Sequence, residues 1–177
     1  MKVNKRFGRL IPIIGPVLLI CFLVSMASAQ SNPQTASESD ARKAFEKLKT
    51  LTGSWEGSIG ELSTQLTIRV TSGGSAILHD ASMASHNKIT MIYLEGDHLY
   101  LTHYADDGNH PRLEGKLLPD GNRVEFSTLE TGGITQKPFM KRAMFILIGP
   151  DRHGIEVTYI LPNGKSVEAR GEFQRTK

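Results

Sequence analysis

Gly53-Ser54-Trp55-Glu56-Gly57 lies between two segments whose hydrophobic periods differ, and this stretch decides the fold. On its N-terminal side, from Ser39, apolar residues recur at three- and four-residue spacing, which predicts a short amphipathic helix. On its C-terminal side the period changes to two, as in strands, and stays so almost to the end of the chain. A helix, a Gly-x-Trp entrance and a run of hairpins predict a closed β-barrel, which favours binding over catalysis.

The predicted strands alternate in polarity and are separated by tight turns. Leu62, Leu66 and Ile68 alternate with polar residues, which indicates one buried and one solvated face. Gly, Asn and Asp recur at the roughly 8–12-residue spacing of hairpins, without room for crossover helices. We therefore expect a mainly β fold, an antiparallel up-and-down barrel of about ten strands, with a two-sheet sandwich as the alternative. The predicted strands are 54–59, 61–71, 75–83, 88–94, 98–105, 112–118, 123–129, 139–148, 155–161 and 166–174.

Residues 1–29 have the layout of a secretory signal. Basic residues precede an apolar run from Leu10 to Val24, and the small residues Ala27-Ser28-Ala29 follow it. Cleavage between Ala29 and Gln30 would leave a flexible spacer over 30–38 and a single barrel domain over 39–177. The protein is then expected to be secreted or periplasmic. The apolar run is short and interrupted by proline, so no stable membrane anchor is expected.

Removing the signal changes the charge of the chain. The signal holds four of the 21 basic residues and none of the 18 acidic ones, so 17 basic and 18 acidic side chains remain, about −1. This balance gives no basis for nucleic acid or an anionic membrane as a partner. The single cysteine, Cys21, leaves with the signal, so the mature chain must be stable through its core without disulfides. The oligomeric state stays open.

The last predicted strand points a basic residue toward the barrel end where Trp55 should lie. Val167, Ala169, Gly171 and Phe173 share a face that Arg175 extends. A guanidinium over an indole contributes about 0.5 to 2 kcal/mol. We therefore predict a structural role for Gly53, Trp55 and Arg175, with Arg170 as the alternative cation.

His103 and Arg112 are the candidate binding pair. His103 shares a strand face with Leu99 and Leu101, and Arg112 follows across a short hairpin. Inside an apolar barrel, an imidazole and a guanidinium would hold the polar end of a ligand such as a carboxylate. The alternative is that both only satisfy buried polar groups. No zinc spacing and no nucleophile motif is present, so neither a metal, a cofactor nor an enzyme activity is expected.

The chain resembles uncharacterised secreted bacterial proteins of the lipocalin-like, or calycin, superfamily, and more distantly nitrobindin. The resemblance implies ligand-binding roles for Tyr93, Tyr104 and Asn109 beside His103 and Arg112. Nitrobindin-like barrels hold haem iron through a histidine near the C-terminal strands, whereas here only His153 lies nearby, at a predicted turn. The residues that carry the resemblance are Phe45 to Gly57, Gly74-Ser75-Ala76, Ile89-Thr90-Met91, Leu94 to Asp97, Leu101-Thr102-His103-Tyr104, Gly108-Asn109 and Pro111-Arg112.

These patterns predict an exported barrel that binds a small apolar or amphipathic molecule in its interior. The alternative is a fully packed structural or interaction barrel, with a haem-binding barrel or a barrel enzyme as minor alternatives. Interior side-chain size separates the first two. Small residues (Ala76, Ala81, Ala143, Ala169 and Gly171) leave room, while large ones (Met91, Phe126, Phe145, Tyr159 and Phe173) fill it.

Overall fold

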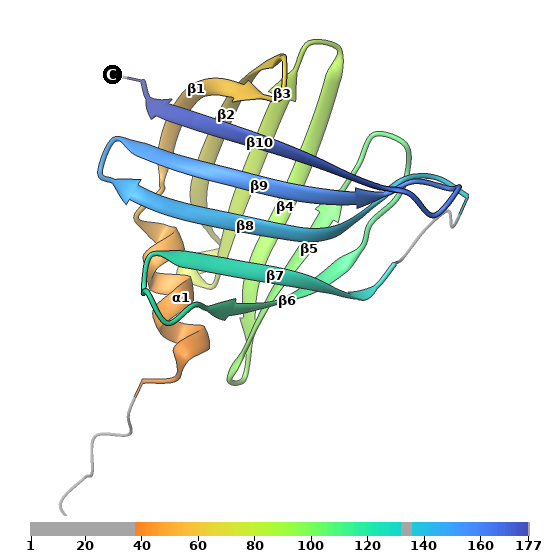
Figure 1. The fold of residues 1–177 in the computed structure, drawn as a ribbon. Coiled ribbons are helices and arrows are strands. Elements are labelled where there is room, and N and C mark those ends of the chain that lie inside the picture. The colour runs from red at the N-terminus through yellow and green to blue at the C-terminus, as the bar shows by residue number, and fades with distance from the viewer. Residues whose placement is uncertain (1–37, 132–135, 177) are drawn as a thin grey trace, which may run out of the picture. The chain divides into compact units, whose positions relative to one another are not determined.

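Ten antiparallel strands close into a barrel in the part of the chain that the computed structural model describes, residues 38–131 and 136–176 (Figure 1). Each strand pairs with its neighbours in sequence, and β1 pairs with β10 to close the sheet, so the predicted up-and-down barrel is confirmed. The elements are α1 (Asp40–Lys49), β1 (Gly53–Ile59), β2 (Leu62–Thr71), a short 3-10 turn (Ser72–Gly74), β3 (Ala76–Met83), β4 (His86–Glu95), β5 (His98–Tyr104), β6 (Arg112–Leu117), β7 (Arg123–Glu130), β8 (Phe139–Gly149), β9 (Arg152–Ile160) and β10 (Ser166–Arg175).

The described elements belong to one compact unit, Ser37–Lys177. The predicted signal, its cleavage site between Ala29 and Gln30 and nearly all of the predicted spacer lie outside the described residues. Among the residues that are described, no helix is long and apolar enough to cross a membrane.

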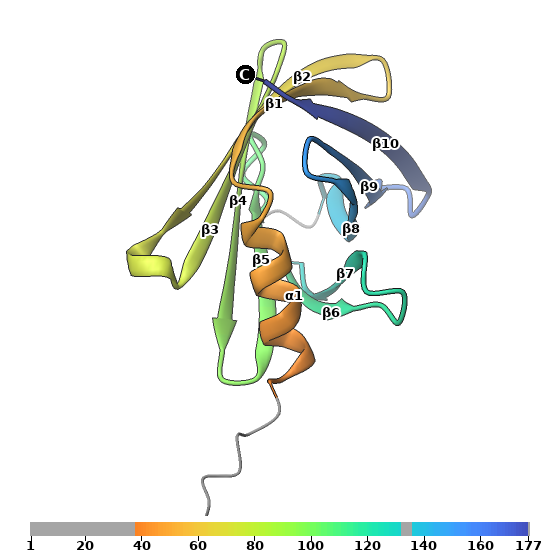
Figure 2. The ribbon, with the colours of Figure 1, turned by 90° about the vertical axis from the view of Figure 1, so that its left-hand side faces the viewer.

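Helix α1 packs its apolar face onto one end of the barrel. The Ser39 hydroxyl accepts a hydrogen bond from the Arg42 N–H at 3.3 Å, which caps the first turn. Phe45 and Leu48 are buried against the sheet, as their spacing predicts. The helix contacts β4, β5 and β6, and Figure 2 shows it lying between β4–β5 and β6–β7. We call this the helix end of the barrel.

Because the topology is up-and-down, alternate hairpin turns fall at opposite ends of the barrel. The turns between β2 and β3, β4 and β5, β6 and β7, and β8 and β9 lie at the helix end. The turns between β1 and β2, β3 and β4, β5 and β6, and β9 and β10 lie at the other end, which we call the open end (Figure 1). The position of a residue along its strand therefore shows whether the residue lies nearer the helix end or the open end.

The helix end is filled by Trp55 and the groups around it. Trp55 is buried, and its indole N–H donates to the Leu51 carbonyl at 2.8 Å. The Arg175 guanidinium lies over the indole, 4.1 Å from the ring centre, so the predicted partner is Arg175 rather than Arg170. On the inner side, the His153 ring meets Trp55 edge to face and stacks on Phe173, with ring centres 4.3 and 5.2 Å apart.

Arg175 also binds backbone carbonyls from two other parts of the chain. Its guanidinium donates to Thr52 at 2.6 Å and Thr50 at 3.2 Å, just after α1, and to Pro150 in the β8–β9 turn at 2.9 Å. Gly53 makes room for this side chain, because a Cβ there would lie 2.3 Å from an Arg175 guanidinium nitrogen. Gly53 has a φ of +142°, which other residues rarely adopt. The structural roles predicted for these residues therefore have a geometric basis.

Strands β4 and β9 begin two and three residues earlier than predicted, because their hairpins use two-residue loops. His86 pairs with Met83, so only Ala84 and Ser85 form the β3–β4 turn. Arg152 pairs with Gly149 across the β8–β9 turn. The predicted turn position of His153 is therefore wrong: it lies in β9, where its side chain points into the barrel and is fully buried.

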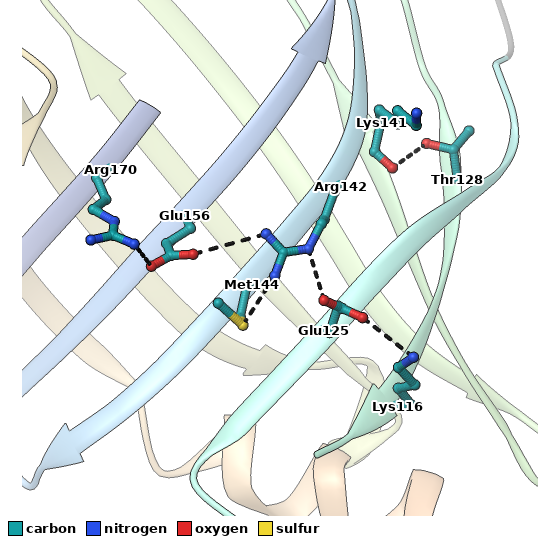
Figure 3. Close-up of polar contacts among 8 residues, drawn as sticks. All are labelled: Lys116, Glu125, Thr128, Lys141, Arg142, Met144, Glu156 and Arg170. Carbon is teal, nitrogen blue, oxygen red and sulfur yellow. Dashed lines mark hydrogen bonds and ion pairs between the residues drawn. The ribbon is translucent and has the colours of Figure 1, made fainter. Parts of the chain in front are cut away.

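An ion-pair ladder crosses the outer face of β6 to β10 (Figure 3). Glu125 forms ion pairs with Lys116 at 3.3 Å and with Arg142 at 2.8 Å. Glu156 forms ion pairs with Arg142 at 3.9 Å and with Arg170 at 2.6 Å. The hydrogen bond from Arg142 lowers the pKa of Glu125. Opposite charges on neighbouring strands favour the observed register, since a one-residue slip would separate them.

Arg175→Lys is expected to destabilise the fold by about 2 kcal/mol, because one ammonium cannot reproduce the several carbonyl hydrogen bonds and the stacking on Trp55. Arg152→Lys is the matched control on the adjacent strand, since its exposed pair with Glu172 should cost at most about 1 kcal/mol. Urea unfolding followed by Trp55 fluorescence measures both. Equal losses in the two variants would contradict the role assigned to Arg175.

Candidate functional site

A cavity of about 230 Å³ occupies the half of the barrel nearer the open end. Its walls are mainly apolar, and the small side chains of Ala81, Ala143 and Ala169 leave the space that larger residues would fill. At the helix end, by contrast, Trp55 and Phe126 are packed with almost no exposure. The interior is therefore divided into a packed half and a hollow half. The cavity is lined by Ile59, Leu62, His79, Ala81, Met83, His86, Lys88, Thr90, Leu101, His103, Met140, Ala143, Phe145, Ile155, Val157, Tyr159 and Ala169.

One wall of the cavity carries a polar row across three adjacent strands. His79 of β3 lies opposite Thr90 of β4, and Thr90 lies opposite His103 of β5. The Thr90 hydroxyl is 2.9 Å from Nδ1 of His103, and the Tyr159 hydroxyl is 3.5 Å from its Nε2. By contrast, Nε2 of His79 is buried without a hydrogen-bond partner among the described residues. The row therefore has one nitrogen left for a molecule in the cavity.

Burial keeps the interior histidines uncharged. Desolvation lowers the pKa of His79 to about 4. Desolvation and, second, the charge of Lys88 lower the pKa of His103 to about 3. The pKa of His153, in the packed half, falls to about 3 for the same reason. Burial also raises the pKa of Tyr159, so its hydroxyl stays protonated. At neutral pH the cavity thus offers neutral hydrogen-bonding groups.

Basic side chains line the open end of the cavity. Lys88 is half-buried, and its ammonium lies 5.3 Å from the centre of the Tyr159 ring. His86, on the same strand, is hydrogen-bonded to the carboxylate of Asp106, which lowers the pKa of that carboxyl. Lys88 has no carboxylate within ion-pair distance in the described part of the chain. A positive charge therefore stands at the entrance without a direct counter-charge.

The structure separates the two residues of the predicted binding pair. His103 points inward and lines the cavity, as its strand pattern predicts. Arg112 lies opposite Thr102 on the outer face, where it pairs with Glu95 at 2.8 Å and covers the Tyr100 ring at 4.0 Å. The predicted placement of Arg112 inside the barrel is therefore wrong. The β5–β6 register puts Pro111, not Arg112, beside His103.

The other three candidate binding residues also lie away from the cavity. The Tyr93 ring lies on the outer face, 6.0 Å from that of Tyr100, and Tyr104 is exposed. Asn109 is buried in the β5–β6 loop, where its side-chain amide donates to the Pro138 carbonyl at 2.7 Å. It therefore joins two loops of the open end. None of these three side chains lines the cavity.

Sequence reasoning missed His79 and Thr90 on the polar wall and Lys88 at the entrance. The strict alternation of Ile77, His79 and Ala81 was available as a signal that His79 points inward. Thr90 follows from the same pattern in β4, two residues before buried Ile92. Lys88 begins the strand predicted over 88–94, where the same alternation places it on the face of Thr90.

The predicted interior also needs three corrections. Ala76 pairs with Tyr93 and is not among the cavity-lining residues. Gly171 does not enlarge the cavity: a Cβ there would lie 2.7 Å from the Ser58 carbonyl oxygen, so the glycine allows close strand approach. Met91 pairs with Leu78 and Thr102 and is not among the cavity-lining residues.

His153, the histidine that was compared with the haem-binding histidine of nitrobindin-like barrels, is packed between Trp55 and Phe173 rather than along the cavity. Within the described residues, no group of three or more His, Cys, Asp or Glu could hold a metal ion.

Comparison with known proteins supports the fold and nothing finer. No protein-family model matches the chain, and no curated protein matches its sequence. Among solved structures, the chain is similar to a protein of unknown function from the DUF3598 family of Nostoc punctiforme, with a TM-score of 0.54 and 16% identity. The match covers 73% of this chain and 49% of that one, so the chain spans about half of that protein. At this identity, the similarity shows a shared fold alone.

The three buried histidines predict that folding is acid-sensitive. Their pKa values of about 3 to 4 lie below the roughly 6.5 of an unfolded histidine, so the unfolded chain binds protons first as the pH falls. Stability that is fully present above about pH 6.5 is lost as the pH falls toward the folded-state values. Between pH 6.5 and 5, the loss should approach about 4 kcal/mol per pH unit for the three groups together.

Urea unfolding at several pH values measures this slope. His153→Met should reduce it by up to about 1.4 kcal/mol per pH unit, because one of the three groups is removed. Free energies of unfolding that stay constant from pH 6.5 to 5 would contradict the assignment. Titration of these rings near pH 6.5 in the folded protein, observed by NMR, would contradict it equally.

Proposed function

We propose that the protein binds a small apolar or amphipathic molecule inside its barrel. The observation that carries this proposal is the cavity of about 230 Å³, which has mainly apolar walls and a polar row on one side. Binding sites for small molecules commonly combine apolar walls with a few placed polar groups. The sequence resemblance to lipocalin-like proteins of the calycin superfamily agrees with this proposal.

The size of the cavity limits the size of the ligand. Drug-sized ligands occupy pockets of about 300–1,000 Å³, and an apolar cavity of about 150 Å³ holds benzene. At about 230 Å³, the cavity suits one ring with a few further atoms, or a short acyl chain. Longer ligands would have to extend through the open end past His86 and Lys88.

A matched pair of variants on β3 tests whether the cavity binds. Toluene is the probe, because it needs only apolar space. Ala81→Leu puts three more carbon atoms into the cavity and should weaken toluene binding by about tenfold or more, as a ring and a leucine cannot share that space. Ser82→Leu makes an equally large side chain on the exposed outer face and should leave the affinity unchanged.

Calorimetric titration measures these affinities, with thermal unfolding as a check that both variants are folded. A wild type that does not bind toluene, or an equal effect of the two substitutions, would favour the alternative of a structural or interaction barrel.

We also propose that the protein acts outside the cytoplasm after removal of residues 1–29. The support is the basic, apolar and small-residue layout that ends at Ala29. Expression of the full chain in a bacterial host, followed by N-terminal sequencing of the exported protein, should give a chain that begins at Gln30. Recovery of an intact Met1 from the membrane fraction would overturn this proposal.

A further inference from the structure

His79 offers a hydrogen-bond acceptor inside the cavity. Its ring is neutral, and a hydrogen bond from the ring to the backbone of His79 itself raises its pKa. Because Nε2 has no hydrogen-bond partner among the described residues, we assign that bond to Nδ1–H, which leaves the lone pair on Nε2. Nε2 is buried, and His79 lines the cavity opposite the apolar side chains of β8 and β9. An unpaired buried acceptor destabilises the protein unless a partner binds to it. A ligand with an O–H or N–H group at this depth would supply that partner.

Lys88 offers the complementary group at the entrance. It lies on β4 two residues before Thr90, with its side chain on the same inner face. Because the strand rise is about 3.4 Å per residue, Lys88 stands roughly 7 Å nearer the open end than the His79–Thr90 level. The carboxylate of Asp106, which interacts electrostatically with Lys88, is hydrogen-bonded to His86 and does not line the cavity. An acidic group of a ligand would therefore meet Lys88 first.

We infer that the ligand is a small acid built on one ring, with a hydrogen-bond donor at the end far from its carboxylate, as in a para-hydroxyphenyl acid. The donor binds Nε2 of His79, the ring lies against Ala143 and Phe145, and the carboxylate lies at Lys88. This inference rests on the proposed function, because it names the chemistry of a molecule in the same cavity. The cavity volume fits one ring, and a para-substituted ring is about as long as the roughly 7 Å of strand that separates the level of Lys88 from that of His79 and Thr90.

Three probes test the inference on the wild-type protein. 4-Hydroxyphenylacetate has both polar ends, 4-fluorophenylacetate keeps the size and the acid but lacks the donor, and p-cresol keeps the donor but lacks the acid. We expect 4-hydroxyphenylacetate to bind about tenfold more tightly than the fluoro acid, and about threefold more tightly than p-cresol. Calorimetry gives all three constants without any variant, so a variant that fails to fold leaves the test intact.

Matched variants then assign each preference to a side chain. His79→Phe should abolish the preference for hydroxyl over fluorine, whereas His98→Phe, which changes a histidine on the outer face, should keep it. Lys88→Met should abolish the preference for the acid over p-cresol. Arg112→Met removes an outer-face cation and should keep that preference.

The outcomes separate this inference from the proposed function. Equal binding of the hydroxyl and fluoro acids, or equal effects of Lys88→Met and Arg112→Met, would overturn the inference while toluene binding upheld the cavity. Binding of neither toluene nor any of the acids by the folded wild type would overturn the proposed function and the inference with it.

Discussion

The contact between the Arg175 guanidinium and the Trp55 indole fixes one end of the barrel, and the rest of the structure depends on it. Arg175 lies on the last strand and Trp55 on the first, so their contact joins the two strands that close the sheet. The same guanidinium binds carbonyls after α1 and in the β8–β9 turn, which ties the helix to the barrel. Gly53 provides the space through which the side chain passes. A single cation therefore connects strand closure, helix docking and a turn.

Filling the helix end leaves the open end hollow. His153 packs between Trp55 and Phe173 in the packed half, whereas Ala81, Ala143 and Ala169 line the hollow half. Near the open end, the polar row and Lys88 give the cavity a direction, with a neutral acceptor at depth and a positive charge at the entrance. This polarity suits a ligand that enters with its donor first and leaves its acidic group at the surface. Arg112 and Arg142, by contrast, are already paired with carboxylates on the outer face of the sheet.

The barrel, its helix and the Trp55–Arg175 contact could be predicted because each depends on local patterns: alternation, turn residues and apolar spacing. The site could be predicted only in part, because it depends on register across hairpins. His103 follows from alternation within one strand, but the side on which Arg112 falls depends on how the loop of 105–111 aligns two strands. The inward orientation of His153 was missed because the two-residue β8–β9 turn lets β9 begin at Arg152, three residues before the predicted strand. The unpaired nitrogen of His79 depends on all of its neighbours at once and has no sequence signature.

The proposed ligand chemistry depends above all on His79, which would act as a free acceptor in the hollow half of the barrel. NMR of the imidazole nitrogens, recorded with and without 4-hydroxyphenylacetate, tests it directly. We expect that Nε2 of His79 carries no proton in the free protein and that its signal shifts on binding, while the signals of His153 in the packed half stay unchanged. A protonated Nε2 of His79 in the free protein, or a bound probe that shifts only histidines of the outer face, would contradict the account.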